Sequence, residues 1–308
     1  MSSGLSIALF PVALGIVMLG IGLSLTTEDF RRVLRHPRVV AICLGCQMLV
    51  LPAIALGLVV AFDLRPELAV GMMLLAASPG GSTAGLYSHL FKGNVALNVS
   101  LTAVNSVLAL FTLPVIVNLA VAGFVGSDDS IGLQFGKVLQ VFALVLIPIA
   151  IGMFVRSRYT AFALRMERPV KILSVVVLVV MIVGALTGIK DDVLDTLGEI
   201  ILIVLVFNVI SLAIGYLAPR LLRIGHRESV ASSFEIGLHN ATLAITVGMS
   251  PALLDNSTMA MPSVVYGTLM FFTAAAFGLV AARRAPAGPE TPAAAPGPAG
   301  RTTRHPAG

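Results

Sequence analysis

Tryptophan is absent from this chain of 308 residues, and cysteine, aromatic and charged residues are all scarce. Charged residues make up 11% of the sequence, whereas a water-soluble domain carries about 25%. Hydrophobic residues make up 57%, and the mean hydropathy is +0.98. This balance excludes an ordinary soluble domain and predicts a protein that lies mostly in a lipid bilayer.

The two cysteines and the net positive charge do not indicate a function of their own. Cys43 and Cys46 have a C-x-x-C spacing, but they lie within an apolar run, so we interpret them as packing residues. The net charge of +5 comes from basic residues scattered among loops without interleaved aromatic residues. This pattern argues against a nucleic-acid partner.

Apolar runs predict an all-α integral membrane protein with nine transmembrane helices, because each span needs about 20 apolar residues. The N-terminal run lacks the basic segment of a signal peptide and is therefore interpreted as the first span. The segment 285–308 is rich in Pro, Ala and Gly and is predicted to be a disordered tail, which leaves 1–284 as the transmembrane domain. The predicted spans lie near residues 5–25, 39–62, 68–91, 95–120, 137–155, 172–189, 199–219, 229–254 and 260–282.

The distribution of basic residues predicts the orientation. With the N-terminus outside, seventeen of the 20 Lys and Arg residues fall on the inner side, and only Arg65, Lys137 and Lys190 fall outside. Such an excess is typical of cytoplasmic loops. We therefore expect a multi-pass protein of the inner membrane with a cytoplasmic C-terminus, and nothing in the sequence implies an obligate protein partner.

One of the fifteen acidic residues, Glu235, lies well inside a predicted span. An ionised carboxylate at that depth costs at least about 2.5 kcal/mol on insertion scales, so we interpret it as functional. Gly237, His239 and Asn240 follow within about two helical turns. A structural acid paired with a neighbour is the alternative.

The third predicted span contains a second irregularity, Ser78-Pro79-Gly80-Gly81-Ser82-Thr83. Proline removes a backbone donor and glycine permits non-helical torsions, so the helix should break there. The third and eighth spans run in opposite directions, as expected for inverted repeats, here about 1–125 and 126–284, whose broken helices cross at a substrate site. Amide groups at a half-helix start favour an anion. The predicted substrate-binding residues are Gly80, Gly81, Ser82, Thr83 and Asn240.

Several motifs together resemble the bile acid:sodium symporter family over residues 5 to 284. They are Gly20-Ile21-Gly22-Leu23-Ser24-Leu25 with Asp29-Phe30, Gln47 with Pro52, the break at 79–81, Lys92-Gly93-Asn94-Val95-Ala96-Leu97 with Thr102, and Glu235-Ile236-Gly237-Leu238-His239-Asn240. The resemblance implies a nine-helix bacterial member with a panel of spans 1, 5 and 6 and a core of the others. It also implies transport, so an enzyme is not expected, and no organic cofactor is implied.

The resemblance further implies two sodium sites. One would use the side chains of Gln47 and Glu235, the carbonyls of Ile236 and Leu238, and position 239, where His239 replaces the usual glutamine. The other is weakened, because Ala84 and Gly85 replace a Ser-Asn pair and Asn98 replaces a serine, which leaves Thr102 and Glu235. At most one intact sodium site is therefore expected.

The sequence leaves the substrate and the coupling ion open. Bile salts, pantoate, 2-oxo acids and sulfated sterols all lie within the range that the resemblance implies for the anion. Because histidine can change charge near neutral pH, a protonated His239 could replace the sodium ion, or exchange could be uncoupled. A membrane enzyme with Glu235 and His239 as acid and base is a remote alternative.

Overall fold

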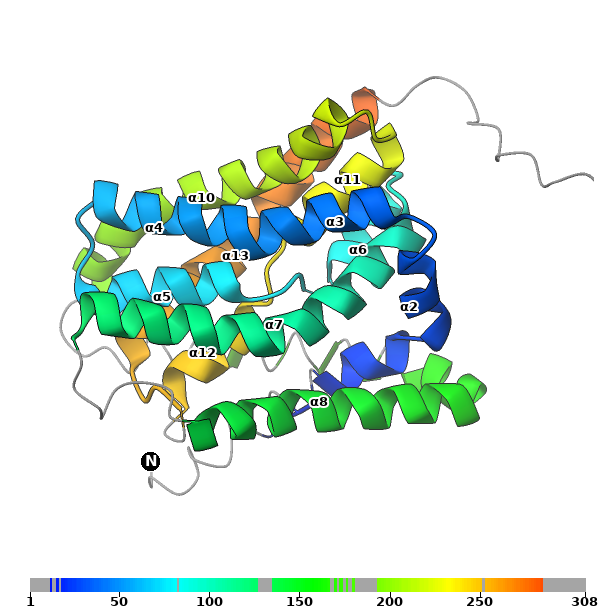
Figure 1. The fold of residues 1–308 in the computed structure, drawn as a ribbon, viewed down its shortest axis with the longest axis horizontal. Coiled ribbons are helices and arrows are strands. Elements are labelled where there is room, and N and C mark those ends of the chain that lie inside the picture. The colour runs from blue at the N-terminus through cyan, green and yellow to red at the C-terminus, as the bar shows by residue number, and fades with distance from the viewer. Residues whose placement is uncertain are drawn as a thin grey trace, which may run out of the picture.

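The computed structural model describes residues 18–81, 83–126, 135–166, 193–250 and 253–284, with isolated residues near 12–16 and 169–180. Within these residues every regular element is helical apart from one isolated β-bridge, and the long helices run roughly side by side (Figure 1). The elements are α2 (Thr27–Val33), α3 (Pro37–Gly45), the π-helical turn η1 (Cys46–Val50), α4 (Leu51–Ala61), α5 (Pro66–Ala77), α6 (Thr83–Leu90), α7 (Val95–Phe124), α8 (Phe135–Arg158), α10 (Val193–Leu221), α11 (His226–Gly237), α12 (Ala241–Met249) and α13 (Ser257–Arg283).

Four helical stretches in the described part of the chain are long and apolar enough to cross a membrane. They are Pro37–Ala61, Val95–Phe124, Leu197–Leu221 and Ser257–Arg283, and each coincides with a predicted span. These stretches and the composition define a multi-pass membrane protein. About half of the predicted span 5–25, most of the predicted span 172–189 and the whole predicted tail at 285–308 lie outside the described residues.

The two irregular spans are broken where the sequence predicted. The third predicted span corresponds to α5 and α6, which are separated by residues 78–82. The eighth predicted span corresponds to α11 and α12, which are separated by residues 238–240. Pro79 and the adjacent glycines interrupt the first pair. In the second pair, Asn240 starts the new helix, because its side-chain oxygen accepts a hydrogen bond of 3.0 Å from the main-chain nitrogen of Leu243.

The second span contains a wide turn that the sequence did not predict. Between α3 and α4 the chain adopts the π-helical turn η1, just before Pro52. Proline has no N–H to donate to the carbonyl of Met48, and its ring would collide with that carbonyl in a regular helix. The wider turn avoids the collision, and Gln47 within it is buried. Such turns are frequent at functional sites.

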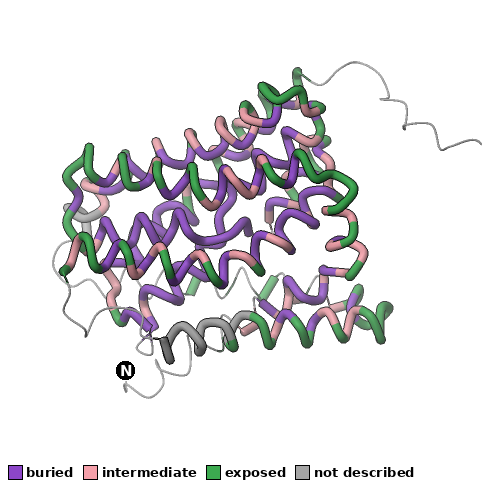
Figure 2. The backbone as a smooth tube through the Cα atoms, viewed as in Figure 1, coloured by how far each residue is buried: buried purple, intermediate pink, exposed green. Residues whose placement is uncertain are grey.

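The breaks lie in the most deeply buried part of the bundle. Figure 2 shows buried backbone around them and exposed positions along the outward faces of the surrounding helices. Every residue of α5 from Leu68 onward is buried, and so is every residue of α11 except Arg227 and Glu228. The outward faces carry exposed leucine, valine and phenylalanine, which suits contact with lipid chains.

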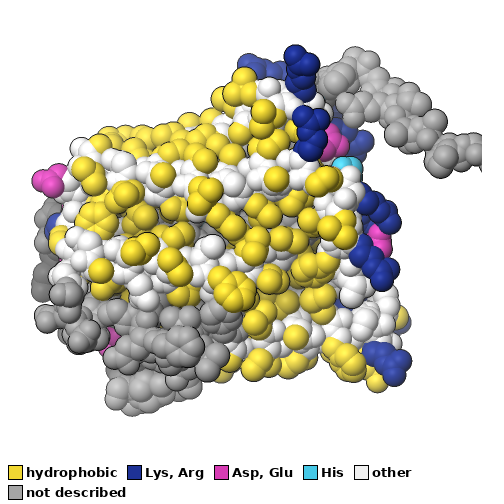
Figure 3. Space-filling model, viewed as in Figure 1, with side chains coloured by type: hydrophobic (Ala, Val, Ile, Leu, Met, Phe, Trp, Pro, Cys, Tyr) yellow, Lys and Arg dark blue, Asp and Glu magenta, His cyan; other side chains and the backbone are white. Residues whose placement is uncertain are grey.

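Charge is concentrated at one end of the bundle. On the face drawn in Figure 3, apolar side chains cover the middle, and most Lys and Arg side chains gather at the end where α2 lies and α3 begins. Helix α8 lies below this bundle beside the helical segment that ends at Ser24. The two helices approach closely, since a side chain at Gly152 would stand 2.7 Å from the backbone of Gly22.

Candidate site at the two helix breaks

The two breaks bind each other through their main chains. Gly80 and His239 form an antiparallel β-bridge. The N–H of Gly81 donates to the carbonyl of Leu238 (2.6 Å), and the N–H of Asn240 donates to the carbonyl of Pro79 (2.7 Å). Backbone groups that have lost their helical partners inside a membrane must find others, and here each break supplies them to the other. The predicted meeting of the third and eighth spans is confirmed.

Gly80 packs directly on the carboxyl group of Glu235. A Cβ atom at position 80 would overlap Oε1 of Glu235 and would stand 2.7 Å from its main-chain oxygen. No side chain fits in that space, so the absence of a side chain at Gly80 is what brings the third span against the acid of the eighth.

Glu235 is fully buried and is held by two side chains of α7. Oγ1 of Thr102 donates to Oε2 at 2.5 Å, and Nδ2 of Asn105 donates to Oε1 at 3.3 Å. Among the described residues no Lys, Arg or His forms an ion pair with this carboxyl group. The negative charge of a buried carboxylate without a cationic partner is uncompensated, and a bound cation would balance it.

Three polar residues follow one face of α7 at helical spacing, namely Asn98, Thr102 and Asn105. The Nδ2 atom of Asn98 donates to the carbonyl of Ala231 (2.9 Å), and Thr102 also lies 3.1 Å from the carbonyl of Asn98. The side-chain oxygens of Asn98 and Asn105 are buried without a hydrogen-bond donor among the described residues. This face of α7 therefore holds Glu235 through Thr102 and Asn105 and carries two buried acceptor oxygens without a donor among the described residues.

Gln47 and His239 both bind the carbonyl of Ser78, at the start of the first break. Nε2 of Gln47 and Nδ1 of His239 each lie 3.0 Å from that oxygen. A carbonyl only accepts, so Nδ1 of His239 carries a proton. Oε1 of Gln47 and Nε2 of His239 are buried without a partner in the described part of the chain.

The imidazole of His239 is packed among aromatic rings. It stacks on Phe207 with a centroid distance of 5.7 Å and meets the ring of Tyr266 edge-on at 5.2 Å. The hydroxyl of Tyr266 and the side-chain amide of Asn208 donate to the carbonyl of Gly237, at 2.9 and 3.0 Å. The end of α11 is thus held by α10 and α13, and His239 has little freedom to move.

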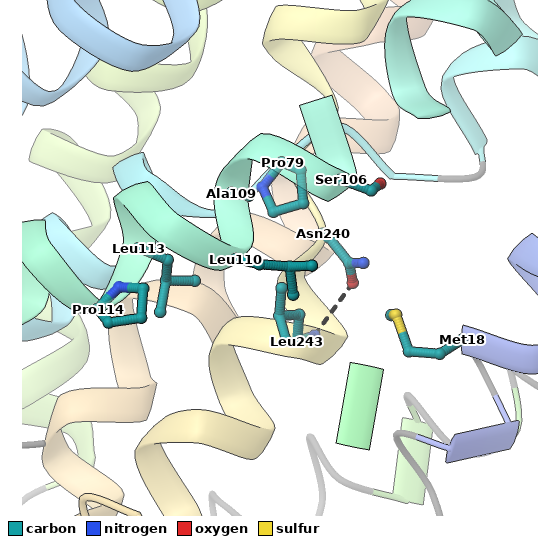
Figure 4. A pocket seen from close by; sticks show the side chains of 9 residues that line it. All are labelled: Met18, Pro79, Ser106, Ala109, Leu110, Leu113, Pro114, Asn240 and Leu243. Carbon is teal, nitrogen blue, oxygen red and sulfur yellow. Dashed lines mark hydrogen bonds between the residues drawn. The ribbon is translucent and has the colours of Figure 1, made fainter. Parts of the chain in front are cut away.

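A narrow pocket lies beside the breaks. Figure 4 shows Asn240 and Pro79 from the breaks, several residues of α7 and Met18 from the N-terminal helical segment around it. Ser106 and Asn240 are the polar side chains in the lining, and the hydroxyl of Ser106 has no partner among the described residues. The other lining residues are Ala109, Leu110, Leu113, Pro114 and Leu243.

The predicted substrate residues have different surroundings. Gly80, Gly81 and Asn240 all lie at the paired breaks, but the N–H of Gly81 is already bound to Leu238 and is not free for an anion. Thr83 is the first residue of α6 and is partly buried. Ser82 lies outside the described residues.

The predicted sodium ligands lie around the breaks, in two groups. The first group contains Gln47 and His239, together with Glu235 and Ile236 near the end of α11 and Leu238 of the second break. The other group contains Asn98, Thr102 and Glu235. Asn105 and Ser106 were not expected at the site, although Asn105 lies three residues after Thr102 on the same helical face and could have been predicted from that spacing.

The fold and the site define a multi-pass membrane protein built around two paired helix breaks and a buried acid. The model of the sodium bile acid symporter family matches residues 11–197. The chain therefore belongs to the sodium bile acid symporter family, whose members are transporters and not enzymes.

Curated relatives carry names of the same kind. An uncharacterized sodium-dependent transporter of Bacillus subtilis is 29% identical over 83% of this chain and 77% of its own length. A probable chloroplastic sodium/metabolite cotransporter of Oryza sativa subsp. japonica is 27% identical over 83% of this chain and 60% of its own length. The human ileal sodium/bile acid cotransporter is 25% identical over 77% of this chain and 67% of its own length.

Proposed function

We propose that this protein is a secondary active transporter that moves a small organic anion across the inner membrane by alternating access, coupled to sodium. The observation that carries the proposal is the pairing of two broken helices around the buried carboxyl group of Glu235. Broken helices that meet at mid-membrane are how many secondary transporters build a shared site for substrate and ion. The names of the relatives support sodium as the coupling ion.

The proposed architecture has nine spans in two inverted repeats, about 1–125 and 126–284, with the N-terminus outside and a cytoplasmic C-terminus. The opposite directions of the two broken spans support it, because their bridge is antiparallel. The clustering of basic side chains at one end of the bundle supports the orientation (Figure 3).

The pocket beside the breaks has room for about one water molecule in this structure, so an organic anion would need it to widen, and its lining favours an anion with a predominantly apolar body. Its lining is mostly aliphatic, and its polar side chains are Ser106 and Asn240. Both can donate a hydrogen bond, Ser106 through its hydroxyl and Asn240 through Nδ2, since Oδ1 of Asn240 caps α12. Within the described lining there is no Lys or Arg, so a monoanion with one carboxylate or one sulfate ester group would suit the pocket better than a dianion.

Flux into proteoliposomes tests the proposal. A panel of carboxylates and sulfated sterols should include at least one substrate that accumulates with an inward sodium gradient and fails to accumulate when choline replaces sodium. Accumulation in choline that rises as the outside pH falls would instead support proton coupling through His239, and gradient-independent exchange would support an uncoupled transporter.

A further inference from the structure

We propose that a groove on the outer surface of the bundle, between α10 and α13, binds an anionic phospholipid. One acyl chain would lie in the groove, and the phosphate of the head group would lie against Arg220 and Arg284 at its end. This site shares no residue with the paired breaks, so the inference goes beyond the proposed transport. The ligand is a lipid with a net negative charge that this surface would select from the surrounding membrane.

The groove is large enough for a ligand and is open along its length. Its volume is about 440 Å³, and pockets for small molecules measure about 300–1,000 Å³. One face of each helix lines it, with Val209, Tyr216 and Leu217 from α10 and Thr273, Ala276 and Val280 from α13. Val209, Leu217 and Val280 are each 51% exposed, so the groove opens away from the core of the bundle.

The polar groups of the lining are turned into the protein. The hydroxyl of Tyr216 lies 3.0 Å from Nδ1 of His226, and the hydroxyl of Thr273 donates to Oδ1 of Asn208. Both hydroxyls therefore have partners already, and the rest of the lining is apolar. An acyl chain suits such a surface, because it fills the space and needs no hydrogen bond.

Two arginines continue the helical faces that line the groove. Arg220 lies four residues after Tyr216, and Arg284 lies four residues after Val280, so each follows the groove by about one turn. Both are exposed, and in the described part of the chain neither forms an ion pair with an acidic side chain. One N–H group of Arg220 donates to the carbonyl of Ile224 (3.0 Å), which leaves the other donors of this guanidinium for a phosphate.

The direction of the groove matches that of a lipid in a bilayer. Helices α10 and α13 end on the same side of the bundle, where basic side chains gather (Figures 1 and 3). A phospholipid with its phosphate at this level extends its chains along the two helices toward the middle of the membrane. In the proposed orientation this end is cytoplasmic, and basic residues between helices on that side favour anionic head groups.

The groove also contacts the helix that carries the buried acid. The carbonyl of Leu212, another lining residue, accepts a hydrogen bond from Oγ of Ser233 (2.7 Å). Cδ2 of Leu212 would stand 2.3 Å from a Cβ atom at Gly237, and Tyr216 contacts His226 at the start of α11. A chain packed in the groove would therefore support the packing of α10 on α11.

Lipid binding is measured on the purified protein in detergent by thermal unfolding. Cys43 and Cys46 are buried free thiols, so a thiol-reactive dye reports unfolding in this protein without tryptophan. Dioleoyl phosphatidylglycerol should raise the melting temperature in a saturable way, because a ligand that binds only the native state stabilises it. Dioleoyl phosphatidylcholine has the same chains and no net charge, and it should need a concentration about tenfold higher or more. Glycerol 3-phosphate, which has no chains, should have no effect.

One pair of variants tests the groove. Ala276 is exposed, so Ala276→Phe should fill the groove without entering the core and should abolish the saturable stabilisation by phosphatidylglycerol. Ala53→Phe makes the same change at an exposed alanine of α4 and should leave the stabilisation unchanged.

A second pair of variants tests the charged end. Arg220→Gln combined with Arg284→Gln should raise the phosphatidylglycerol concentration at half-maximal stabilisation by about tenfold or more. Arg31→Gln combined with Arg38→Gln removes the same charge from exposed positions of α2 and α3 and should not shift it. The four arginines are exposed, so these variants decide the matter even if Ala276→Phe does not fold.

Several results would overturn the inference. Equal stabilisation by the two lipids, or an unchanged response after loss of Arg220 and Arg284, would mean that the charged end selects nothing. Stabilisation by glycerol 3-phosphate, with Ala276→Phe unaltered, would mean that only the head group binds. A lipid-free dimer that Ala276→Phe dissociates would make the groove an interface between two copies of the chain.

Discussion

Gly80 and Glu235 touch across the two broken spans so closely that a single methyl group on Gly80 would overlap the carboxyl group of Glu235. The acid cannot shift freely, because Thr102 and Asn105 hold it from the other side. The two broken helices are therefore coupled through the contact between the carboxyl group of Glu235 and the backbone of Gly80. A movement of either break must move the acid.

Gly80→Ala should abolish transport, because the added methyl group displaces the carboxyl group of Glu235 or separates the breaks. Overpacking of this kind costs about 1–3 kcal/mol, so the protein should still insert and fold. The measurement is uptake per folded molecule. Replacement of Gly80 by alanine together with Gly81 by leucine should reduce uptake further. Gly57→Ala is the control, because apart from its two chain neighbours and the backbone of its own helix no atom lies within 4 Å of a Cβ atom there. Normal uptake by Gly80→Ala would show that the break is only a kink.

Glu235→Gln should leave the protein folded and nearly abolish concentrative uptake. Glutamine has the same shape and can still accept the hydrogen bond from Thr102, but it carries no charge to attract a cation. Accumulation against a gradient and the sodium-dependent rise in melting temperature should disappear together. Full accumulation by this variant would remove Glu235 from the coupling site.

Asn240→Asp should weaken substrate binding without disturbing α12. Aspartate caps a helix as well as asparagine does, so the bond to the N–H of Leu243 is kept. The substitution removes the Nδ2 donor and places a negative charge beside the anion, so the KM for uptake should rise by about tenfold or more. Asn256→Asp makes the same change at the cap of α13 and should leave uptake unchanged. An unaltered KM in Asn240→Asp would place the anion elsewhere.

Sodium dependence of uptake should follow a Hill coefficient near one. Ala84 and Gly85 provide no side-chain oxygen, and His239 provides no oxygen at the other group of ligands. Linkage then requires that substrate and one sodium ion raise each other's affinity by the same factor. Isothermal titration calorimetry of each ligand, with and without the other, measures the two factors. A clear dependence on two sodium ions would contradict this prediction.

His239→Gln should preserve sodium-driven uptake, because glutamine can donate to the carbonyl of Ser78 and also supplies an oxygen. In the unmodified protein, uptake in choline should stay at background at every outside pH between about 6 and 8, the range in which an ordinary histidine changes charge. If uptake in choline rises toward low pH and His239→Gln abolishes that rise and restores sodium dependence, the histidine replaces the cation.

The sequence by itself determined that the protein lies in a membrane and where its two helix breaks fall. Membrane residence follows from the low content of charge, since lipid tolerates few ionised groups. The break at 79–81 follows from the chemistry of proline and glycine, which acts within a few residues of the chain. The isolated acid at Glu235 is also recognisable as a candidate functional residue without any knowledge of its neighbours.

Only the tertiary structure decided which groups are free. The amides that the sequence assigned to an anion include that of Gly81, but the opposite break uses it, because two chains that meet in lipid satisfy each other first. The unpaired oxygens of Asn98 and Asn105, the role of Asn240 as a cap and the aromatic packing of His239 depend on contacts between distant spans. Hydrogen-bond satisfaction is a property of the whole packed bundle, so no local pattern of residues predicts it.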